Sequence, residues 1–538
     1  MILNQKDITL NKAEWEAKGY HLPAFDREAM IAYTKEHPVW VHFGAGNIFR
    51  AFQAAAAQRL LEKGVMKAGI IAVDGYDYEI VTKNYRPHDN LSVAVTLKAN
   101  GTIEKNVIGS IAESCVLDSD NEAEYSRMKE IFTAPSLQFA SFTITEKGYA
   151  VKGTDGNYTK ATLDDFLAGP EKPHSYIGKV ASLLYARYKA GELPVAMVSM
   201  DNCSHNGDKL HDAMSTFAKA WTENGKAEAG FKTYVENPAK VSFPWTMIDK
   251  ITPRPDASVQ KMLEKDGLDL TPVVTSKNTY VAPFVNAEES EYLVIEDHFP
   301  NGRPDLDKAG IIFTDKETVD KVEKMKVCTC LNPLHTALAV FGCLLGYTKI
   351  SDEMKDNDLV NLVERIGYKE GLPVVVAPGI LEPKHFIDVV INVRVPNPFM
   401  PDTPQRIATD TSQKLAIRFG ETIKAYMGRN DLNVMDLKCI PFVFAGWLRY
   451  LMALDDNGNP FTPSPDPLLE EVTPYVKKFE LGKNYTAEEI KKEVLPLLKN
   501  PVIFGTDLEE CGLADRVAED FAKLLKGKGA VRKALQEI

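Results

Sequence analysis

The chain has 538 residues, well beyond the roughly 100–200 residues of a usual single domain, so we expect two large domains. Its 44% hydrophobic and 26% charged residues are typical of a globular protein and exclude a disordered or collagen-like chain. The formal net charge of −12 argues against nucleic acid and anionic membranes as partners.

The N-terminal residues, MILNQKDITLNKAEWEAKGY, lack the continuous apolar core of a secretory signal. No stretch is expected to approach the roughly 18–20 apolar residues that span a bilayer, so the chain is predicted to be cytoplasmic. The seven cysteines are scattered and odd in number, which predicts reduced thiols. Cys328 and Cys330 form a CxC without a second ligand pair at zinc spacing, so we expect no metal.

The first clear unit runs from residue 38 to residue 77, as VWVHF, GAGN, IFRAFQAAAAQRLLEKG and GIIAVD. This pattern predicts strand, glycine turn, helix and strand, the opening of a doubly wound nucleotide-binding sheet. Further apolar runs continue the alternation to about residue 300: LSVAVTL, QFASFTIT, LPVAMVSM and TPVVT. The fold class is therefore α/β, with an N-terminal Rossmann-type domain.

The turn after the first strand resembles a dinucleotide fingerprint. Gly44 and Gly46 can allow a tight turn and close approach of the following amides of Asn47 and Ile48 to a pyrophosphate. Phe49 replaces the third glycine, so we expect looser packing of helix on strand, and a plain turn remains the alternative.

Asp74 ends the second strand. A carboxylate there can accept hydrogen bonds from ribose hydroxyls and repel a 2′-phosphate, which favours NAD over NADP as the cofactor. The alternative is a solvated turn aspartate.

After Thr314 the pattern becomes helical. The segment TDKETVDKVEKMK is expected to open with a Thr-x-x-Glu capping box at Thr314, and TALAVFGCLLGY, QKLAIRFGETIKAYM and FVFAGWLRYLMAL have helical periodicity. We therefore expect an NAD-binding domain over residues 1–314 and a mainly α-helical substrate and catalytic domain over residues 315–538.

Eight ordered blocks resemble the long-chain mannitol dehydrogenase family: FGAGNIFRAFQ from residue 43, TEKGY from 145, MDNCSHNG from 200, TMIDKITP from 246, VIEDHFPNGRP from 294, LNPLHTALAVFG from 331, RVPNP from 394 and DTSQK from 410. The resemblance covers most of the chain. It implies a Rossmann-type domain, a helical C-terminal domain, and zinc-independent hydride transfer between NAD and a substrate held between the two.

The resemblance also implies a catalytic Lys-x4-Asn-x2-His motif with a second Asn from the N-terminal domain. The matching positions are Lys326, Asn332, His335 and Asn202. Lys326 lies one residue further from Asn332 than the family spacing, so we expect a kink or bulge between them, and Lys324 is the fallback.

These residue types suit reduction of a ketone, because the developing oxyanion needs hydrogen-bond donors and a proton. Asn202 and Asn332 can donate amide hydrogens and Lys326 can supply the proton, while His335 shares a helix face with Asn332 and can bind a neighbouring hydroxyl. Taken singly, the lysine also fits a solvated helix residue, the asparagine an N-cap and the histidine a core residue.

Two charged residues are assigned to binding. The resemblance places Asp249 beside the nicotinamide, where a loop-stabilising carboxylate is the alternative. Arg394 can clamp a substrate carboxylate with two parallel hydrogen bonds, and an interdomain salt bridge is its alternative.

The resemblance implies reduction of D-fructuronate to D-mannonate with NADH, in the manner of the family's sugar-acid enzymes. Mannitol or tagaturonate as substrate remains open, as does an NAD-retaining epimerase. We expect a sugar acid or polyol as the small-molecule partner, and a monomer or small homo-oligomer.

Overall fold

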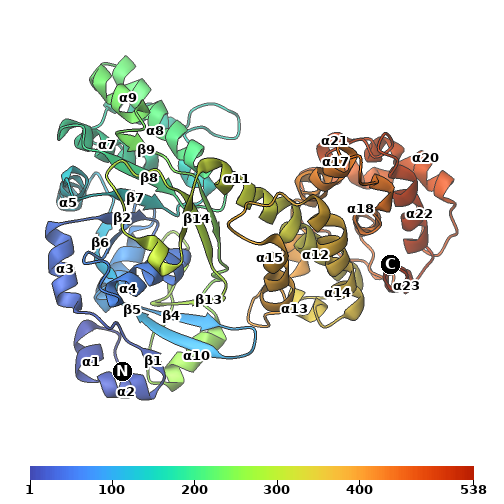
Figure 1. The fold of residues 1–538 in the computed structure, drawn as a ribbon, viewed down its shortest axis with the longest axis horizontal. Coiled ribbons are helices and arrows are strands. Elements are labelled where there is room, and N and C mark those ends of the chain that lie inside the picture. The colour runs from blue at the N-terminus through green and yellow to red at the C-terminus, as the bar shows by residue number, and fades with distance from the viewer. The chain divides into compact units, whose positions relative to one another are not determined.

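The computed structural model describes residues 1–538 and divides them into two compact units, Met1–Asp320 and Lys321–Ile538. The first unit contains the parallel sheet and the second is mainly helical (Figure 1), so the fold class expected from the sequence is confirmed. All seven cysteines are free thiols, as expected.

The first unit is built on a six-stranded, fully parallel sheet in the order β6-β3-β2-β7-β8-β9. This is the doubly wound order, in which the chain moves outward from β2 in one direction and then in the other. The strands are β2 (Trp40–Phe43), β3 (Ile70–Asp74), β6 (Ile111–Val116), β7 (Phe139–Phe142), β8 (Val195–Ser199) and β9 (Val241–Ser242). The switch point lies between β2 and β7, where ligands bind in such sheets.

Alternation along each strand divides the core into two layers. In β2, Trp40 packs with helix α4 (Ala54–Glu62), whereas Val41 and Phe43 pack with α5 (Glu122–Thr133), α7 (Tyr176–Lys189) and α8 (Asn206–Glu223) on the other face. Because both faces are covered, every residue of β2 is buried.

Two of the expected strands lie outside this sheet. LSVAVTL forms β4 (Ser92–Leu97), which pairs antiparallel with β5 (Ile103–Ile108) in the sheet β1-β5-β4-β13. TPVVT contributes β11 (Val273–Val274), which pairs only with β12 (Tyr280–Val281). A short hairpin joins neighbouring strands antiparallel, so β4 and β5 form a separate ladder. The expected continuous alternation was wrong here.

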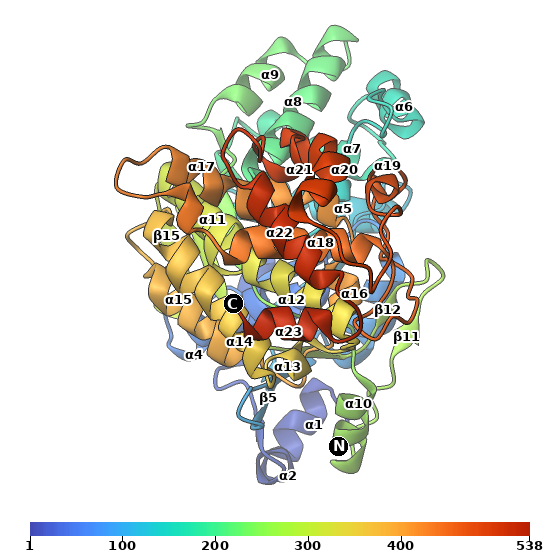
Figure 2. The same cartoon turned by 90° about the vertical axis from the view of Figure 1, so that its right-hand side faces the viewer.

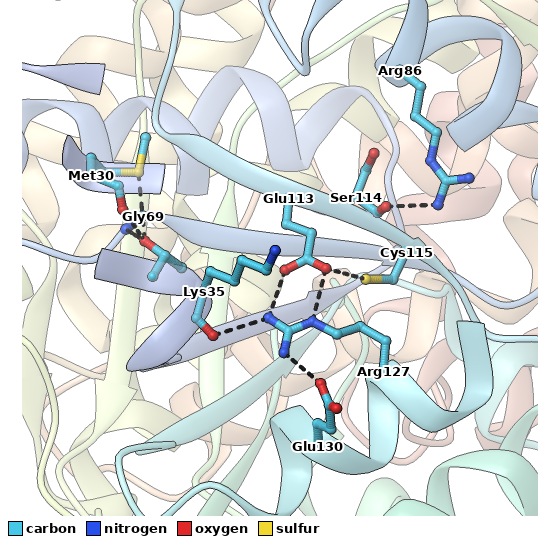
Figure 3. Close-up of polar contacts among 10 residues, drawn as sticks. Met30, Lys35, Gly69, Arg86, Glu113, Ser114, Cys115, Arg127 and Glu130 are labelled. Carbon is cyan, nitrogen blue, oxygen red and sulfur yellow. Dashed lines mark hydrogen bonds and ion pairs between the residues drawn. The ribbon is translucent and has the colours of Figure 1, made fainter. Parts of the chain in front are cut away.

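The outer edge of the sheet is protected by charge. Strand β6 is an edge strand, and its Glu113 carboxylate accepts two hydrogen bonds from Arg127 of α5, both at 2.9 Å (Figure 3). Arg127 also pairs with Glu130 at 3.0 Å. A charged edge discourages pairing with another chain, so β6 ends the sheet.

Helix α11 (Lys316–Met325) begins differently from the expectation. Thr314 is the last residue of strand β15 (Ile312–Thr314), and Asp315 caps the helix by accepting from the Thr318 amide at 2.8 Å. Asp315, an equally good cap, therefore replaces the predicted Thr314.

Helix α12 (Asn332–Leu345) is the central element of the second unit and packs against α18 (Cys439–Leu451), which in turn packs against α22 (Ala514–Leu524) (Figures 1 and 2). Phe341 stacks on Phe442 with ring centroids 4.9 Å apart. Gly446 permits this contact, because a Cβ there would lie 2.6 Å from the Phe341 ring. The other α-helices of seven or more residues in this unit are α14 (Asn357–Glu364), α15 (Pro383–Val389), α17 (Glu421–Met427), α20 (Ala487–Leu498) and α23 (Ala530–Gln536).

One helical run, Lys316–Leu345, is long and apolar enough by composition to cross a membrane, contrary to the expectation that no stretch would be. Of its apolar window, 72% is buried inside the protein. This burial is typical of a core helix, whose apolar surface faces other protein segments.

Candidate functional site

The turn after β2 requires glycine at its first position. Gly44 has φ +102°, and a Cβ on it would lie 2.1 Å from the carbonyl oxygen of Thr143, which follows β7. The Gly44 amide donates to Val73 O of β3 at 2.9 Å. Gly44 therefore allows the backbone to cross between three strands at the switch point.

In the glycine turn (Gly44–Asn47), side chains hold the backbone carbonyls of Gly44, Ala45 and Gly46 and the side chain of Asn47. Tyr85 donates its hydroxyl to Ala45 O at 3.0 Å, and Arg50 donates to Gly46 O at 3.4 Å and to Asn47 Oδ1 at 3.0 Å. Arg50 is fully buried and also donates to Ala282 O at 2.6 Å. The turn is thus fixed without any ligand, which favours binding because less freedom remains to be lost.

A buried chain of hydrogen bonds supports the turn from below. Trp40 donates to Ser141 Oγ at 2.7 Å, and Thr143 Oγ1 donates its one proton to Gly44 O at 3.2 Å. His42 Nε2 therefore donates to Thr143 Oγ1 at 2.8 Å, and Nδ1 of the neutral ring accepts from Ser141 Oγ at 2.6 Å. Burial lowers the pKa of His42 to about 3, so the ring stays neutral. A neutral ring donates at one nitrogen and accepts at the other, which fixes the direction of the hydrogen bonds through it.

The turn leads directly into a helix that can receive an anion. A Cβ on Gly46 would meet no atom within 4 Å, so space is open beside it. Asn47, Ile48 and Phe49 open the helix, and first-turn amides have no intrahelical acceptor. Phe49 begins the π-helical turn η1 (Phe49–Gln53) and stacks on His42 at 4.1 Å, which accommodates a ring where the fingerprint has glycine.

Asp74 is buried and held by backbone amides. Its carboxylate is 6% exposed and accepts from the amides of Tyr76 (2.9 Å), Asp77 (2.7 Å) and Ala45. Burial raises its pKa. Asp74 therefore ties the end of β3 to the glycine turn, and this role as a turn residue exists alongside the predicted role toward ribose.

Asn202 follows Asp201 at the end of β8, and Asp201 is strongly anchored. The Asp201 carboxylate accepts from the amides of Ile144 and Thr145, both at 2.9 Å, and from Tyr149 Oη at 2.5 Å. Thr145 is held at φ 64° and ψ 161°, a region that is strained for any residue with a Cβ. The loop after β7 and the segment that carries Asn202 are thus locked together.

Asp249 is the last residue of β10 (Thr246–Asp249) and is 8% exposed. This strand lies in the small sheet β10-β14-β15, apart from the six-stranded sheet. Asn47 Nδ2 donates to Pro253 O at 3.2 Å, which brings the segment after Asp249 to the glycine turn. The first unit therefore gathers the predicted cofactor residues around the carboxyl ends of its strands.

The extra residue between Lys326 and Asn332 lies in a π-helical turn. The turn η6 (Lys326–Cys330) follows α11, and Leu331 N donates to Lys326 O at 3.1 Å, five residues back. A π turn holds one more residue than an α turn, so the expected bulge is present. Lys326 is 3% exposed whereas Lys324 is exposed, and burial favours Lys326 as the residue that can be tuned for proton transfer.

Asn332 and His335 both belong to α12, whose N-cap is Leu331. Asn332 is therefore the first helical residue, and the alternative of a simple N-cap asparagine was wrong. Burial lowers the pKa of His335 to about 4, and Asp402, with Oδ2 3.8 Å from His335 Nε2, opposes this effect. His335 is thus neutral near pH 7 and can both donate and accept a hydrogen bond.

Three arginines surround His335, and we call them the His335 cluster: Arg394, Arg406 and Arg418. Each lowers the pKa of His335. Arg394, at the end of the π turn η9 (Val390–Arg394), is 3% exposed. Arg406 forms an ion pair with Asp402. The sequence pointed to Arg394 alone.

Sequence reasoning missed several residues that shape the site: His42, Arg50, Tyr85, Asp201 and Arg418. Arg50 and Asp201 lie in blocks that resemble the family, but the motifs assigned no role to any of the five. A charged or hydrogen-bonding residue inside an apolar run was the available signal, as for His42 in VWVHF and Arg50 in IFRAF.

A family model described as the mannitol dehydrogenase Rossmann domain matches residues 39–308, and one described as the mannitol dehydrogenase C-terminal domain matches residues 318–525. The D-mannonate oxidoreductase of Thermotoga maritima is 51% identical over 541 residues, which cover 100% of this chain and 99% of that relative. The polyol:NADP oxidoreductase of Gluconobacter oxydans is 30% identical, over 79% of this chain and 83% of the relative. The ternary complex of Pseudomonas fluorescens mannitol 2-dehydrogenase with NAD and D-mannitol has a TM-score of 0.69 and 25% identity, and covers 100% of this chain and 99% of that one. The chain therefore belongs to the mannitol dehydrogenase family.

Proposed function

We propose that the protein is an NAD-dependent D-mannonate oxidoreductase, which converts D-fructuronate, NADH and a proton into D-mannonate and NAD. The observation that carries this proposal is the 51% identity to the Thermotoga maritima D-mannonate oxidoreductase over the full length of both chains. The arrangement of each unit supports it, through the dinucleotide turn in the first and the buried lysine before α12 in the second.

The residues of the first unit fit NAD. The open space beside Gly46 and the first-turn amides of Asn47, Ile48 and Phe49 suit a pyrophosphate, and Asp74 supplies an acidic group at the end of β3. NAD, when bound, supplies or accepts the hydride. One relative in the family is named a polyol:NADP oxidoreductase, so membership of the family does not decide between NAD and NADP. That choice depends on residues of this chain, such as Asp74.

The protein's part of the reaction is to stabilise negative charge and move one proton. Lys326 gives its proton to the ketone oxygen during reduction and takes it back during oxidation. Asn332 and Asn202 donate amide hydrogens to the same oxygen, and His335 binds an adjacent hydroxyl. Arg394 contributes positive charge for the carboxylate of the sugar acid. Asp249 supports the nicotinamide side of the cofactor site.

The purified protein should be assayed with NADH and NADPH against D-fructuronate, D-tagaturonate and D-fructose. We expect the highest kcat/KM with D-fructuronate and NADH, and stoichiometric formation of NADH when D-mannonate and NAD are supplied. A preference for D-fructose would reassign the protein to mannitol dehydrogenase activity, the alternative supported by the likeness to mannitol 2-dehydrogenase. Interconversion of sugar acids without free NADH would identify an epimerase.

A further inference from the structure

Arg418 lies beside the helix that carries Asn332 and His335. It belongs to the π-helical turn η11 (Ala416–Gly420), and its Nη1 donates to Thr336 Oγ1 at 2.6 Å. Thr336 directly follows His335 in α12 and donates to Asn332 O at 2.9 Å. The guanidinium group of Arg418 is therefore connected to the first turn of α12 through one hydroxyl group.

Arg418 has a single hydrogen bond within the protein and no acidic partner. The group is half-buried, and loss of solvent alone lowers its pKa to about 10, with no carboxylate opposing the shift. It stays charged at neutral pH. A desolvated charge without a partner is unfavourable, so folded proteins rarely retain one without a use for it.

Arg187 in the first unit shows what a purely structural buried arginine looks like in this chain. It too lacks a carboxylate, but its guanidinium group donates to five backbone carbonyls, those of Leu193, Phe132, Ala134, Leu137 and Pro194. Its hydrogen-bonding capacity is filled. Arg418 uses only Nη1, so the edge formed by Nε and Nη2 still offers two parallel donors.

Arg418 is also unpaired among the charges near His335. The acidic group Asp402 lies near His335 and pairs with Arg406, whereas no carboxylate pairs with Arg418. Lys414 also lies near Arg418: burial and Arg418 lower the pKa of Lys414, while Asp410 and Asp466 raise it. Neither carboxylate pairs with Arg418, so an anion that reaches the Nε–Nη2 edge meets a positive charge that no acid occupies.

We propose that the Nε–Nη2 edge of Arg418 binds the carboxylate of the sugar-acid substrate, which makes Arg418 a substrate-binding residue that determines the preference for sugar acids over neutral polyols. This inference rests on the proposed function. A guanidinium edge matches a carboxylate with two parallel hydrogen bonds, and a neutral polyol has no group of that charge and shape.

Two variants test the inference. Arg418→Gln removes the charge and Arg418→Lys keeps the charge but lacks the two-donor edge. Calorimetry would measure the Kd for D-mannonate with NAD present, and steady-state assays the KM for D-fructuronate. We expect both constants to rise roughly 10- to 100-fold in Arg418→Gln, the loss typical of a hydrogen bond to a charged group, with only partial recovery in Arg418→Lys. The Kd for NADH and the thermal unfolding curve should change little.

Arg406→Gln is the matched control, because it removes a positive charge from the same cluster at an arginine that already has Asp402 as partner. Its effect on D-mannonate binding should be several-fold smaller. Equal effects of the two glutamine variants, or an unchanged Kd in Arg418→Gln, would overturn the inference while turnover of D-fructuronate leaves the proposed function standing. If D-mannonate binds through Arg418 but no hydride transfer occurs, the inference stands and the proposed function fails. If the unmodified protein neither binds nor turns over sugar acids, both are wrong.

Discussion

The glycine turn of the first unit and the His335 cluster of the second differ in how their polar groups are satisfied. In the turn, Thr143, Tyr85 and Arg50 hold the carbonyls of Gly44, Ala45 and Gly46, and Asp74 holds the Ala45 amide, before any ligand arrives. In the cluster, Nε and Nη2 of Arg418 make no hydrogen bond within the protein, and no carboxylate pairs with this arginine. This difference indicates that hydrogen bonds hold the glycine turn rigid before a cofactor binds, whereas in the His335 cluster a ligand would supply the missing hydrogen-bond partners.

We expect the largest effect at Lys326, the buried lysine of the second unit that we propose as the proton donor and acceptor. Lys326→Ala should lower kcat by roughly 10²- to 10⁴-fold, the usual contribution of a general acid or base, with the Kd for NADH little changed. Stopped-flow measurement of NADH oxidation and fluorescence titration of NADH would check the two parts.

Lys324→Ala removes the same charge from an exposed position in the preceding helix and should keep most of the activity. If Lys324→Ala is the inactive variant and Lys326→Ala is active, the catalytic lysine must be reassigned.

A substitution at Gly44 tests the rigidity of the glycine turn. Gly44→Ala places a Cβ 2.1 Å from Thr143 O at φ +102° and should lower the free energy of unfolding by about 3 kcal/mol or more. Gly46→Ala is the control, because its Cβ meets no protein atom within 4 Å. It should leave the unfolding midpoint almost unchanged and weaken NADH binding by occupying space beside the pyrophosphate. Equal loss of stability in both variants would contradict a special role for Gly44.

Glu353 is a second polar side chain of the second unit whose hydrogen bonds are not satisfied within the protein. It ends α13 (Ile350–Glu353), is fully buried, and neither carboxyl oxygen has a hydrogen-bond partner. Burial raises its pKa from 4.5 to about 9. Between these two values the unfolded chain releases the proton and the folded chain keeps it, so the free energy of unfolding falls as pH rises, by up to about 1.4 kcal/mol per pH unit.

Glu353→Gln should remove this dependence. We expect about 2–3 kcal/mol of extra stability at pH 6.5 and almost none at pH 4, where the acid is mostly protonated in both states. Urea unfolding at the two pH values measures the difference. An equal change at both values would mean that Glu353 is not held in its neutral form.

The smallest effect is expected at Asp74, which has a structural role and a predicted role toward the cofactor. Asp74→Ser removes an acceptor of three backbone amides and should cost about 1–2 kcal/mol of stability. It should also raise the ratio of NADPH to NADH use, because a repelling charge is lost. Asp77→Asn is the control, since Asp77 accepts from Thr275 Oγ1 in the same turn. A larger shift in the cofactor ratio for Asp77→Asn would transfer the role to Asp77.

The sequence predicted the elements with strong local signals. The strand-turn-helix-strand unit from residue 38 and the helical second unit follow from periodicity and glycine. The bulge before Asn332 follows from the longer spacing relative to the family motif and from Pro333. It did not predict that LSVAVTL pairs in a different sheet, because strand pairing depends on distant residues. The role of Arg418 could not be recognised from the sequence either, because this residue is distinguished only by having no carboxylate partner in the folded structure.

The π turn between Lys326 and Asn332 bears on how this chain is aligned with its relatives. Such a turn takes up one additional residue while the helix on each side keeps its own regular hydrogen bonding. A difference in length of one residue is then confined to a single turn, and the gap in an alignment belongs inside residues 326–330. Counting back a constant number of positions from the asparagine would select Val327, an apolar side chain with no proton to give, as the equivalent of the lysine.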